Sequence, residues 1–220
     1  MDKKIFIANW KSHKTKDEAI AFFEYLKDNI SKLDPSSKEI VIAPPFTLLS
    51  KSRHLIDKYK LPIKLCAQNV SSFPEGAYTG EINAKQVKEF AEYVIVGHSE
   101  RRKYLHEKDY DIENKVREAD EVGLQVIQCV QDENSPVFKG AKIVAFEPPS
   151  AIGSGNPDDP QHIAEVFEKI KKDYPQVNLL YGGSVAPENI NQFLEIDNLS
   201  GFLIGGASLE PDSFISLLNG

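Results

Sequence analysis

Val144-Ala-Phe-Glu147-Pro-Pro-Ser-Ala-Ile-Gly153-Ser-Gly155 is the stretch around which this chain is organised. A short apolar run ends in a single carboxylate, and two prolines that fix φ follow it directly. Two glycines further on permit backbone conformations that other residues avoid. A carboxylate at the end of a buried strand, before a stiff and then flexible loop, is typical of a base beside a moving lid. An ordinary strand-to-helix connection is the alternative at this point.

Short apolar runs alternate with amphipathic segments on both sides of this stretch. The runs predict strands at residues 5–9, 40–43, 63–67, 94–97, 126–130, 143–146, 178–181 and 201–204. Apolar residues at helical spacing predict helices at residues 17–33, 48–59, 85–91, 112–121, 163–170 and 187–194, and a closing helix to Leu218. Strands that are apolar on both faces and separated by helices form a parallel sheet with covered faces.

Eight strand–helix units are the number that closes a (β/α)₈ barrel, so the predicted fold class is α/β, a TIM barrel of eight parallel strands. An open doubly wound sheet is the competing topology. The first strand is not followed by Gly-x-Gly-x-x-Gly, which leaves a dinucleotide-binding fold with little support. Residues 1–220 contain no long repeat, low-complexity tract or linker, and we expect a single barrel domain.

The crossover between the fifth and sixth strands is unusually short. Only eleven residues, from Gln131 to Ala141, join the two strands, and a crossover helix with its turns needs at least about that many. The fifth crossover helix is therefore expected to be shortened or missing. Val144 and Phe146 alternate with Glu147 along the strand and should face outward. We expect Val137 and Phe138 to cover them; the alternative is an open flank that packs against another subunit.

Composition excludes several classes of function. The net charge of −7 argues against general nucleic-acid binding, which needs a basic surface. The two cysteines, Cys66 and Cys129, lie in apolar runs and indicate neither a disulfide framework nor a metal site, which favours a reducing compartment. The chain passes from Met1 straight into a predicted strand, so we expect no signal peptide. No apolar run is long enough to span a membrane, so we expect a cytoplasmic protein.

Chemically capable groups follow the predicted strands. Lys11 and Asn9 follow the first strand, His98 the fourth and Glu147 the sixth. In a barrel of this kind the carboxyl ends of the strands meet at one face. Lysine, histidine and glutamate together suit proton transfer with stabilisation of negative charge. Small residues that expose backbone N–H groups and suit phosphate binding follow the last two strands: Gly182, Gly183, Ser184, Gly205 and Gly206.

Each of these residues alone has a plain structural reading. A single histidine at a strand end is more often a hydrogen-bonded structural residue, Lys11 could be one solvated lysine among many, and Gly-Gly pairs usually mark turns. Their occurrence at equivalent ends of different strands favours a functional site.

Six motifs, taken together, resemble the triosephosphate isomerase family. They occur in family order and cover almost the whole chain: Asn9-Trp-Lys11, Gly97-His-Ser-Glu-Arg-Arg102, Phe146-Glu147-Pro, Ala151-Ile-Gly-Ser-Gly155, Tyr181-Gly-Gly-Ser-Val185 and Gly205-Gly-Ala-Ser-Leu209. The resemblance implies an isomerase that interconverts dihydroxyacetone phosphate and D-glyceraldehyde 3-phosphate in glycolysis and gluconeogenesis. It implies no metal and no organic cofactor.

The resemblance also implies roles for the site residues. Glu147 would be the catalytic base. His98 would be a neutral imidazole whose pKa is depressed by the helical turn beginning at Ser99, as is known for this family. Lys11 would supply positive charge, Asn9 a hydrogen bond to a substrate oxygen, and Glu100 a supporting carboxylate. The phosphate would be held by Gly153, Ser184, Gly205 and Gly206.

Two further segments take their roles from the same resemblance. Residues 148–155 would form a lid that excludes water, held closed with the help of Tyr181 and Ser184. The loop from Gln68 to Glu81, with its Tyr78-Thr79-Gly80 tip, would enter a pocket near Asn9 and Glu100 of a second subunit. The loop is also too long and polar for a simple crossover. We therefore expect a homodimer; a tetramer, as in the archaeal branch, would be compatible with it.

The chain departs from the common family pattern in its hinge, Pro148-Pro149-Ser150, and in Cys129-Val-Gln-Asp beneath the lid. Two alternatives stay open at this point. One is another phosphate-binding barrel enzyme, although a Schiff-base aldolase would need a lysine where the sixth strand ends in Glu147. The other is a barrel that binds phosphorylated metabolites without turnover.

Overall fold

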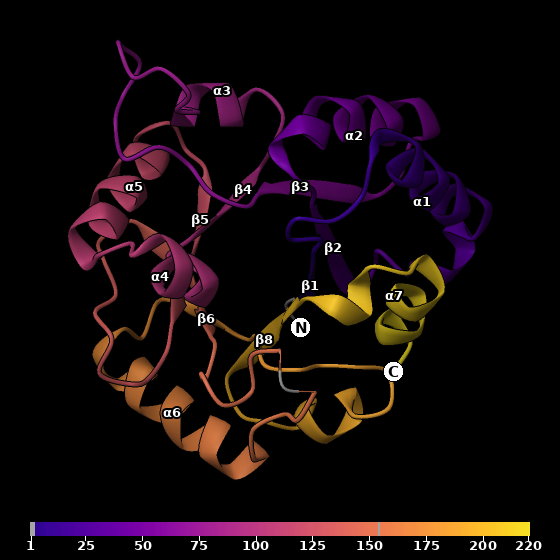
Figure 1. Cartoon of the computed structure of the whole chain (residues 1–220). Coiled ribbons are helices and arrows are strands. Elements are labelled where there is room, and N and C mark those ends of the chain that lie inside the picture. The colour runs from indigo at the N-terminus through magenta and orange to yellow at the C-terminus, as the bar shows by residue number, and fades with distance from the viewer. Residues whose placement is uncertain (1–2, 154) are drawn as a thin grey trace.

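The computed structural model describes residues 3–153 and 155–220, and its strands close into a barrel with helices around the outside (Figure 1). Neighbouring strands pair in parallel in sequence order, and β1 completes the barrel by pairing with β8. The strands are β1 (Lys4–Asn9), β2 (Lys38–Ala43), β3 (Ile63–Ala67), β4 (Tyr93–Val96), β5 (Gln125–Val130), β6 (Ala141–Phe146), β7 (Asn178–Tyr181) and β8 (Leu199–Ile204). The predicted fold class is confirmed.

The helices of the described chain are α1 (Lys16–Asp28), α2 (Phe46–Tyr59), α3 (Ala84–Lys88), α4 (Ser99–Leu105), α5 (Asp109–Glu121), α6 (Pro160–Asp173) and α7 (Pro211–Leu218). Six of the seven helices in the described chain occur where helices were predicted, and α4 was expected only as a helical turn beginning at Ser99. Three 3₁₀ turns add η1 (Ile30–Lys32), η2 (Ile190–Phe193) and η3 (Gly206–Ser208). The single domain expected over residues 1–220 includes Met1 and Asp2, which lie outside the described residues.

Two predicted helices are wrong in extent. The helix expected over 17–33 stops at Asp28, where Asn29 caps α1, and the chain continues as the turn η1. The helix expected over 187–194 is reduced to the 3₁₀ turn η2. Asn189 gives the reason, because its side chain accepts from the Ala186 N–H at 2.8 Å and donates to the Ser184 carbonyl at 3.0 Å. Such local bonds compete with the regular helical pattern.

Side chains divide between the barrel interior and the layer beneath the helices because they alternate along each strand. Ile143 and Ala145 of β6 belong to the interior cluster. Val144 and Phe146 belong to the larger outer cluster, which the helices cover. The outward orientation predicted for Val144 and Phe146 is confirmed, and it leaves the next residue, Glu147, at the mouth of the barrel.

The segment that replaces the fifth crossover helix is an irregular cap. Residues 131–140, all of which the structure describes, contain no helix. Val137 and Phe138 are half-buried and pack against the outer cluster, as expected. Gln128, a fully buried residue between two inward-facing neighbours on β5, holds this cap in place. Its Nε2 donates to the Pro136 carbonyl at 2.6 Å, and its Oε1 accepts from the Phe138 N–H at 2.9 Å.

None of the helices in the described part of the chain is both long enough and apolar enough to cross a lipid bilayer.

Candidate active site

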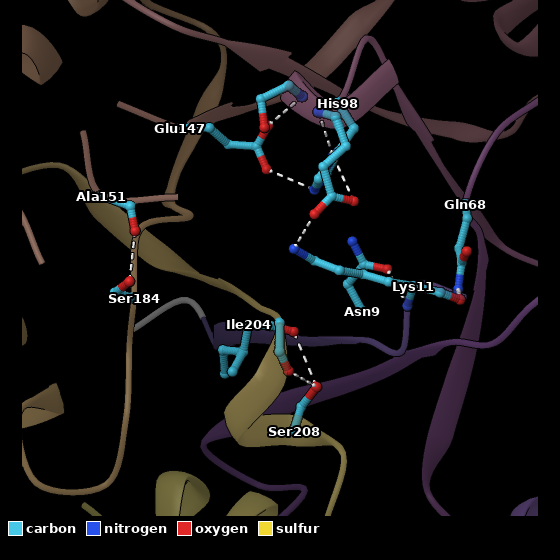
Figure 2. Close-up of polar contacts among 12 residues, drawn as sticks. Asn9, Lys11, Gln68, His98, Glu147, Ala151, Ser184, Ile204 and Ser208 are labelled. Atoms are coloured by element: carbon cyan, nitrogen blue, oxygen red, sulfur yellow. Dashed lines mark hydrogen bonds and ion pairs between the residues drawn. The ribbon is translucent and has the colours of Figure 1, made fainter. Parts of the chain in front are cut away.

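The polar residues predicted at the strand ends meet at one pocket. The pocket has a volume of about 280 Å³ and is lined by eight of the nine predicted site residues: Asn9, Lys11, His98, Glu147, Gly153, Ser184, Gly205 and Gly206. Glu100, the ninth, contacts Lys11 from the side. Figure 2 shows Glu147 and His98 pointing toward one another, with Lys11 and Asn9 below them. Residues that follow five different strands therefore share one cavity.

Glu147 is almost fully buried, yet its carboxylate is well supported. Its Oε1 lies 3.0 Å from Nε2 of His98, and its Oε2 accepts from the Ser99 N–H at 2.9 Å. Burial raises the pKa of Glu147, but the pairing with His98, the Ser99 N–H and the Cys129 thiol outweigh burial and lower that pKa overall. Glu147 is thus held as a carboxylate, the form that can accept a proton.

His98 caps the amino end of α4 with its side chain. Its Nδ1 accepts from the Glu100 N–H at 3.2 Å, which requires a lone pair on Nδ1. The ring proton therefore lies on Nε2 and points at Glu147, and the imidazole is neutral. Such a tautomer can donate a hydrogen bond to an oxygen in the pocket.

The depressed pKa expected for His98 is wrong for this arrangement. Burial, the largest contribution, does lower the pKa of His98, but the Glu147 carboxylate and, more weakly, Glu100 raise it further than burial lowers it. The net shift is upward because the base lies in contact with the ring. That contribution depends on where the carboxylate of Glu147 points.

Lys11 has an unusual backbone conformation that the surrounding residues hold. Its φ is 51°, in the left-handed region that few side chains adopt. The Asn9 side chain accepts from the Lys11 N–H at 3.0 Å, and Gln68 Nε2 donates to the Lys11 carbonyl at 2.9 Å. The Lys11 ammonium then reaches Glu100 Oε1 at 2.6 Å. This ion pair holds the positive charge of Lys11 at the rim of the pocket. The chain as a whole is acidic, with a net charge of −7.

Gln68 is a supporting residue that the sequence analysis missed. Figure 2 shows Gln68 beside Lys11. Gln68 also donates to the Ala43 carbonyl at 2.8 Å, so it joins the ends of β1, β2 and β3. Gln68 directly follows β3. The strand-end rule that selected Asn9 would have selected Gln68 as well.

The opposite wall of the pocket is formed by backbone. Gly205 lies so near Lys11 that a Cβ at this position would come within 3.2 Å of the lysine Cε. Ser208 fixes the loop by donating to the Ile204 and Gly205 carbonyls at 3.0 and 2.7 Å. A wall of glycine backbone beside one ammonium group suits an anion such as phosphate.

Comparison with known proteins decides the family. The sequence model of the family described as Triosephosphate isomerase matches residues 4–220. The chain belongs to the triosephosphate isomerase family. It is 38% identical over 249 residues to Triosephosphate isomerase of Thermodesulfovibrio yellowstonii, with 99% of each chain covered. It is 38% identical to that of Dictyoglomus turgidum, covering 97% of this chain and 98% of the other. It is 36% identical to Triosephosphate isomerase of Trichodesmium erythraeum, covering 100% of this chain and 99% of the other.

Membership of the triosephosphate isomerase family bears on the alternatives. It favours the isomerase over another phosphate-binding barrel enzyme and over a non-catalytic barrel. The geometry agrees, because the position that a Schiff-base lysine would occupy at the end of β6 holds a buried carboxylate instead.

The segment that the triosephosphate isomerase resemblance assigned as the lid is attached within its length, at Ala151, and the chain just after it is attached at Asp158. Ser184 Oγ donates to the Ala151 carbonyl at 2.5 Å, and the Asp158 N–H donates to Tyr181 Oη at 2.8 Å. Gly153 lies between these attachments, is exposed and has a φ of 67°. Ser154, within the expected lid, lies outside the described residues. Of the two residues expected to hold the lid, Ser184 contacts it directly, whereas the bond of Tyr181 is to Asp158, three residues beyond the end of the lid.

Proposed function

We propose that this chain interconverts dihydroxyacetone phosphate and D-glyceraldehyde 3-phosphate by proton transfer through an enediolate, with residues 1–220 acting as one catalytic domain. The observation that carries the proposal is the buried pair of Glu147 carboxylate and neutral His98, 3.0 Å apart, in a pocket that also holds Lys11. A base, a neutral hydrogen-bond donor and a cation are what carbon-to-carbon proton transfer beside a carbonyl requires.

Glu147 must move to act as the base. Both of its oxygens are occupied here, one by His98 and one by the Ser99 N–H. When the carboxylate turns toward a substrate carbon, the Nε2–H of His98 is released and can donate to the substrate carbonyl oxygen. Glu147 then carries the proton from one carbon to the next while His98 and Lys11 stabilise the negative oxygen. The same movement removes the contact that raises the pKa of His98.

The remaining predicted site residues complete this proposal. Asn9 orients the substrate oxygen beside Lys11, and Glu100 positions the ammonium group through the 2.6 Å ion pair. The phosphate is held by Gly153, Ser184, Gly205 and Gly206, opposite the base. A coupled assay with D-glyceraldehyde 3-phosphate tests the function directly. Turnover by the purified chain is expected, and inactivity of a correctly folded dimer would refute the proposal.

We also propose a homodimer formed through the loop 68–81. Phe73 and Tyr78 of this loop are exposed, and their rings stack with centroids 4.5 Å apart, so the loop presents an ordered apolar surface. A second pocket, of about 360 Å³, lies beside Lys11 and Glu100. Its lining includes Tyr104 and Leu105, whose exposed fractions of 65% and 61% are high for apolar side chains. A loop tip from a second copy would cover them.

Sedimentation tests the dimer. A species of twice the chain mass, or of four times that mass, is expected at micromolar concentration, and Thr79→Arg at the loop tip should shift it toward the monomer with a loss of activity. A fully active monomer would contradict the proposal.

We also propose that the protein is cytoplasmic, which the free, fully buried thiols of Cys66 and Cys129 support. Cell fractionation tests that location.

A further inference from the structure

We infer that Asp158 and His162 form a clamp that fastens the chain just after the lid to helix α6 and so favours the closed lid. The inference rests on the proposed function, because it assigns these two residues a positioning role in the same reaction. Neither residue lines the pocket, and neither was selected by the sequence analysis. Their contacts assign the role.

Asp158 is held by its carboxylate and by its backbone. Its Oδ2 lies 2.7 Å from Nδ1 of His162, and its Oδ1 accepts from the Asp159 N–H at 2.9 Å. Its own N–H donates to Tyr181 Oη at 2.8 Å. The Asp158 side chain is only 17% exposed, so these bonds are partly shielded from water. One residue thus connects the chain that leaves the lid with β7 and with the first turn of α6.

His162 extends this connection to the strand that carries the base. Its ring packs edge-on against Phe146, with centroids 6.2 Å apart and an interplanar angle of 72°. Phe146 directly precedes Glu147 and also packs against Tyr181, at 6.5 Å. The four residues therefore form a ring of contacts: Asp158 contacts His162, His162 contacts Phe146, Phe146 contacts Tyr181, and Tyr181 contacts Asp158. Movement of the chain just after the lid is coupled to the packing immediately behind the base.

The clamp determines where the lid can pivot. Helix α6 begins firmly, because Asp159 accepts from the Gln161 N–H at 2.7 Å and Pro160 occupies the first turn. With its carboxylate bound to His162, Asp158 moves as part of α6. The pivot must then lie before Asp158, where Pro157 has a fixed φ. Fewer backbone torsions are free to rotate, so the open lid has fewer conformations and the closed lid is favoured.

A looser lid has a chemical consequence for an enediolate. The oxyanion at C1 can form a carbonyl again. The π electrons of the C1=C2 double bond then form a C2=C3 double bond, and the C3–O bond to the phosphate breaks. The products are inorganic phosphate and the enol of a three-carbon dicarbonyl compound, so no co-reactant is needed. A closed lid suppresses this elimination by holding the phosphate and excluding water. Phosphate release per isomerisation therefore reports on the clamp.

The test compares His162→Ala and Asp158→Ala with the wild type. Removing a hydrogen bond to a charged group of this exposure should raise both KM and the ratio of phosphate released to isomer formed by about fivefold, with kcat within about twofold. His162→Asn keeps a donor near the position of Nδ1 and should restore most of the wild-type ratio. Gln161→Ala, in the same turn but bonded to Glu165, is the matched control and should change neither quantity.

Hydrogen exchange provides a readout that does not depend on catalysis. The Asp158 amide and the lid amides should exchange faster in His162→Ala and Asp158→Ala, whereas the amides of β6 and β7 should not. Unchanged exchange at these amides would overturn the clamp even if the chain proved to have another activity. An unchanged KM and elimination ratio in an active His162→Ala enzyme would overturn the clamp while leaving the isomerase assignment intact.

Discussion

Nε2 of His98 lies 3.0 Å from Oε1 of Glu147, so the donor that should polarise the substrate and the base that should deprotonate it are bonded to each other. The contact keeps Glu147 ionised in a fully buried position and fixes the ring proton on Nε2. It also leaves each group ready to exchange this partner for a substrate atom. We therefore predict that altering either residue affects catalysis far more than folding.

His98→Gln should slow turnover at least about a hundredfold, because the amide does not reproduce the short hydrogen bond to the substrate oxygen. The fold should be retained as judged by circular dichroism. The matched comparison is His106→Gln, an exposed histidine at the carboxyl end of α4, which should remain near wild-type activity. Equal activity of the two variants would remove His98 from the mechanism.

Phe138→Ala tests the cap over β5 and β6. Phe138 is half-buried, so its truncation should lower the free energy of unfolding by about 2 kcal/mol, less than the roughly 3 kcal/mol of a fully buried phenylalanine. Urea denaturation measures the change, and sedimentation should show an unaltered assembly. A variant that dissociates into smaller assemblies would instead identify this flank as a subunit interface.

Gln128→Ala should destabilise the same cap by a different route. The substitution leaves the Pro136 carbonyl and the Phe138 N–H without their buried partner, at a cost of about 2 kcal/mol in unfolding free energy. Gln125→Ala, at the half-buried start of β5, is the control and should cost less. The double variant Gln128→Ala/Phe138→Ala should lose less than the sum of the two, because both act on one segment. Strict additivity would argue against a single cap.

The pH dependence of stability tests the lowered pKa of Glu147. Its folded-state value lies below the ordinary 4.5, so its contribution to stability is complete above that pH and is lost as the pH falls through the folded value. Urea denaturation of the wild type and of Glu147→Gln should therefore show a difference in unfolding free energy that is constant near neutrality and declines below about pH 4.5. A difference that stays constant to pH 3 would mean that the pKa of Glu147 is not lowered.

The fold and most of the site could be predicted because both depend on regular features of the sequence. Apolar runs located the eight strands, and the positions just after them located Lys11, His98 and Glu147. Gln68 could have been found by the same rule, but most of the other misses involve bonds between segments that only the fold brings together. In the sequence, Gln128 is one polar residue in an apolar strand, and only the folded structure places the cap against it. Asp158 looks like a residue that begins a helix, and only the fold brings Tyr181 and His162 into contact with it. The prediction of a helix over residues 187–194 failed because the Asn189 side chain forms local hydrogen bonds with the backbone in place of a regular helix.

Glu147→Gln shows whether Glu147 is the base. The amide keeps the shape of the side chain but does not accept the carbon-bound proton. In the coupled assay with D-glyceraldehyde 3-phosphate, kcat should fall at least about a hundredfold while the circular dichroism spectrum is unchanged. Near-normal turnover by this variant would contradict the account.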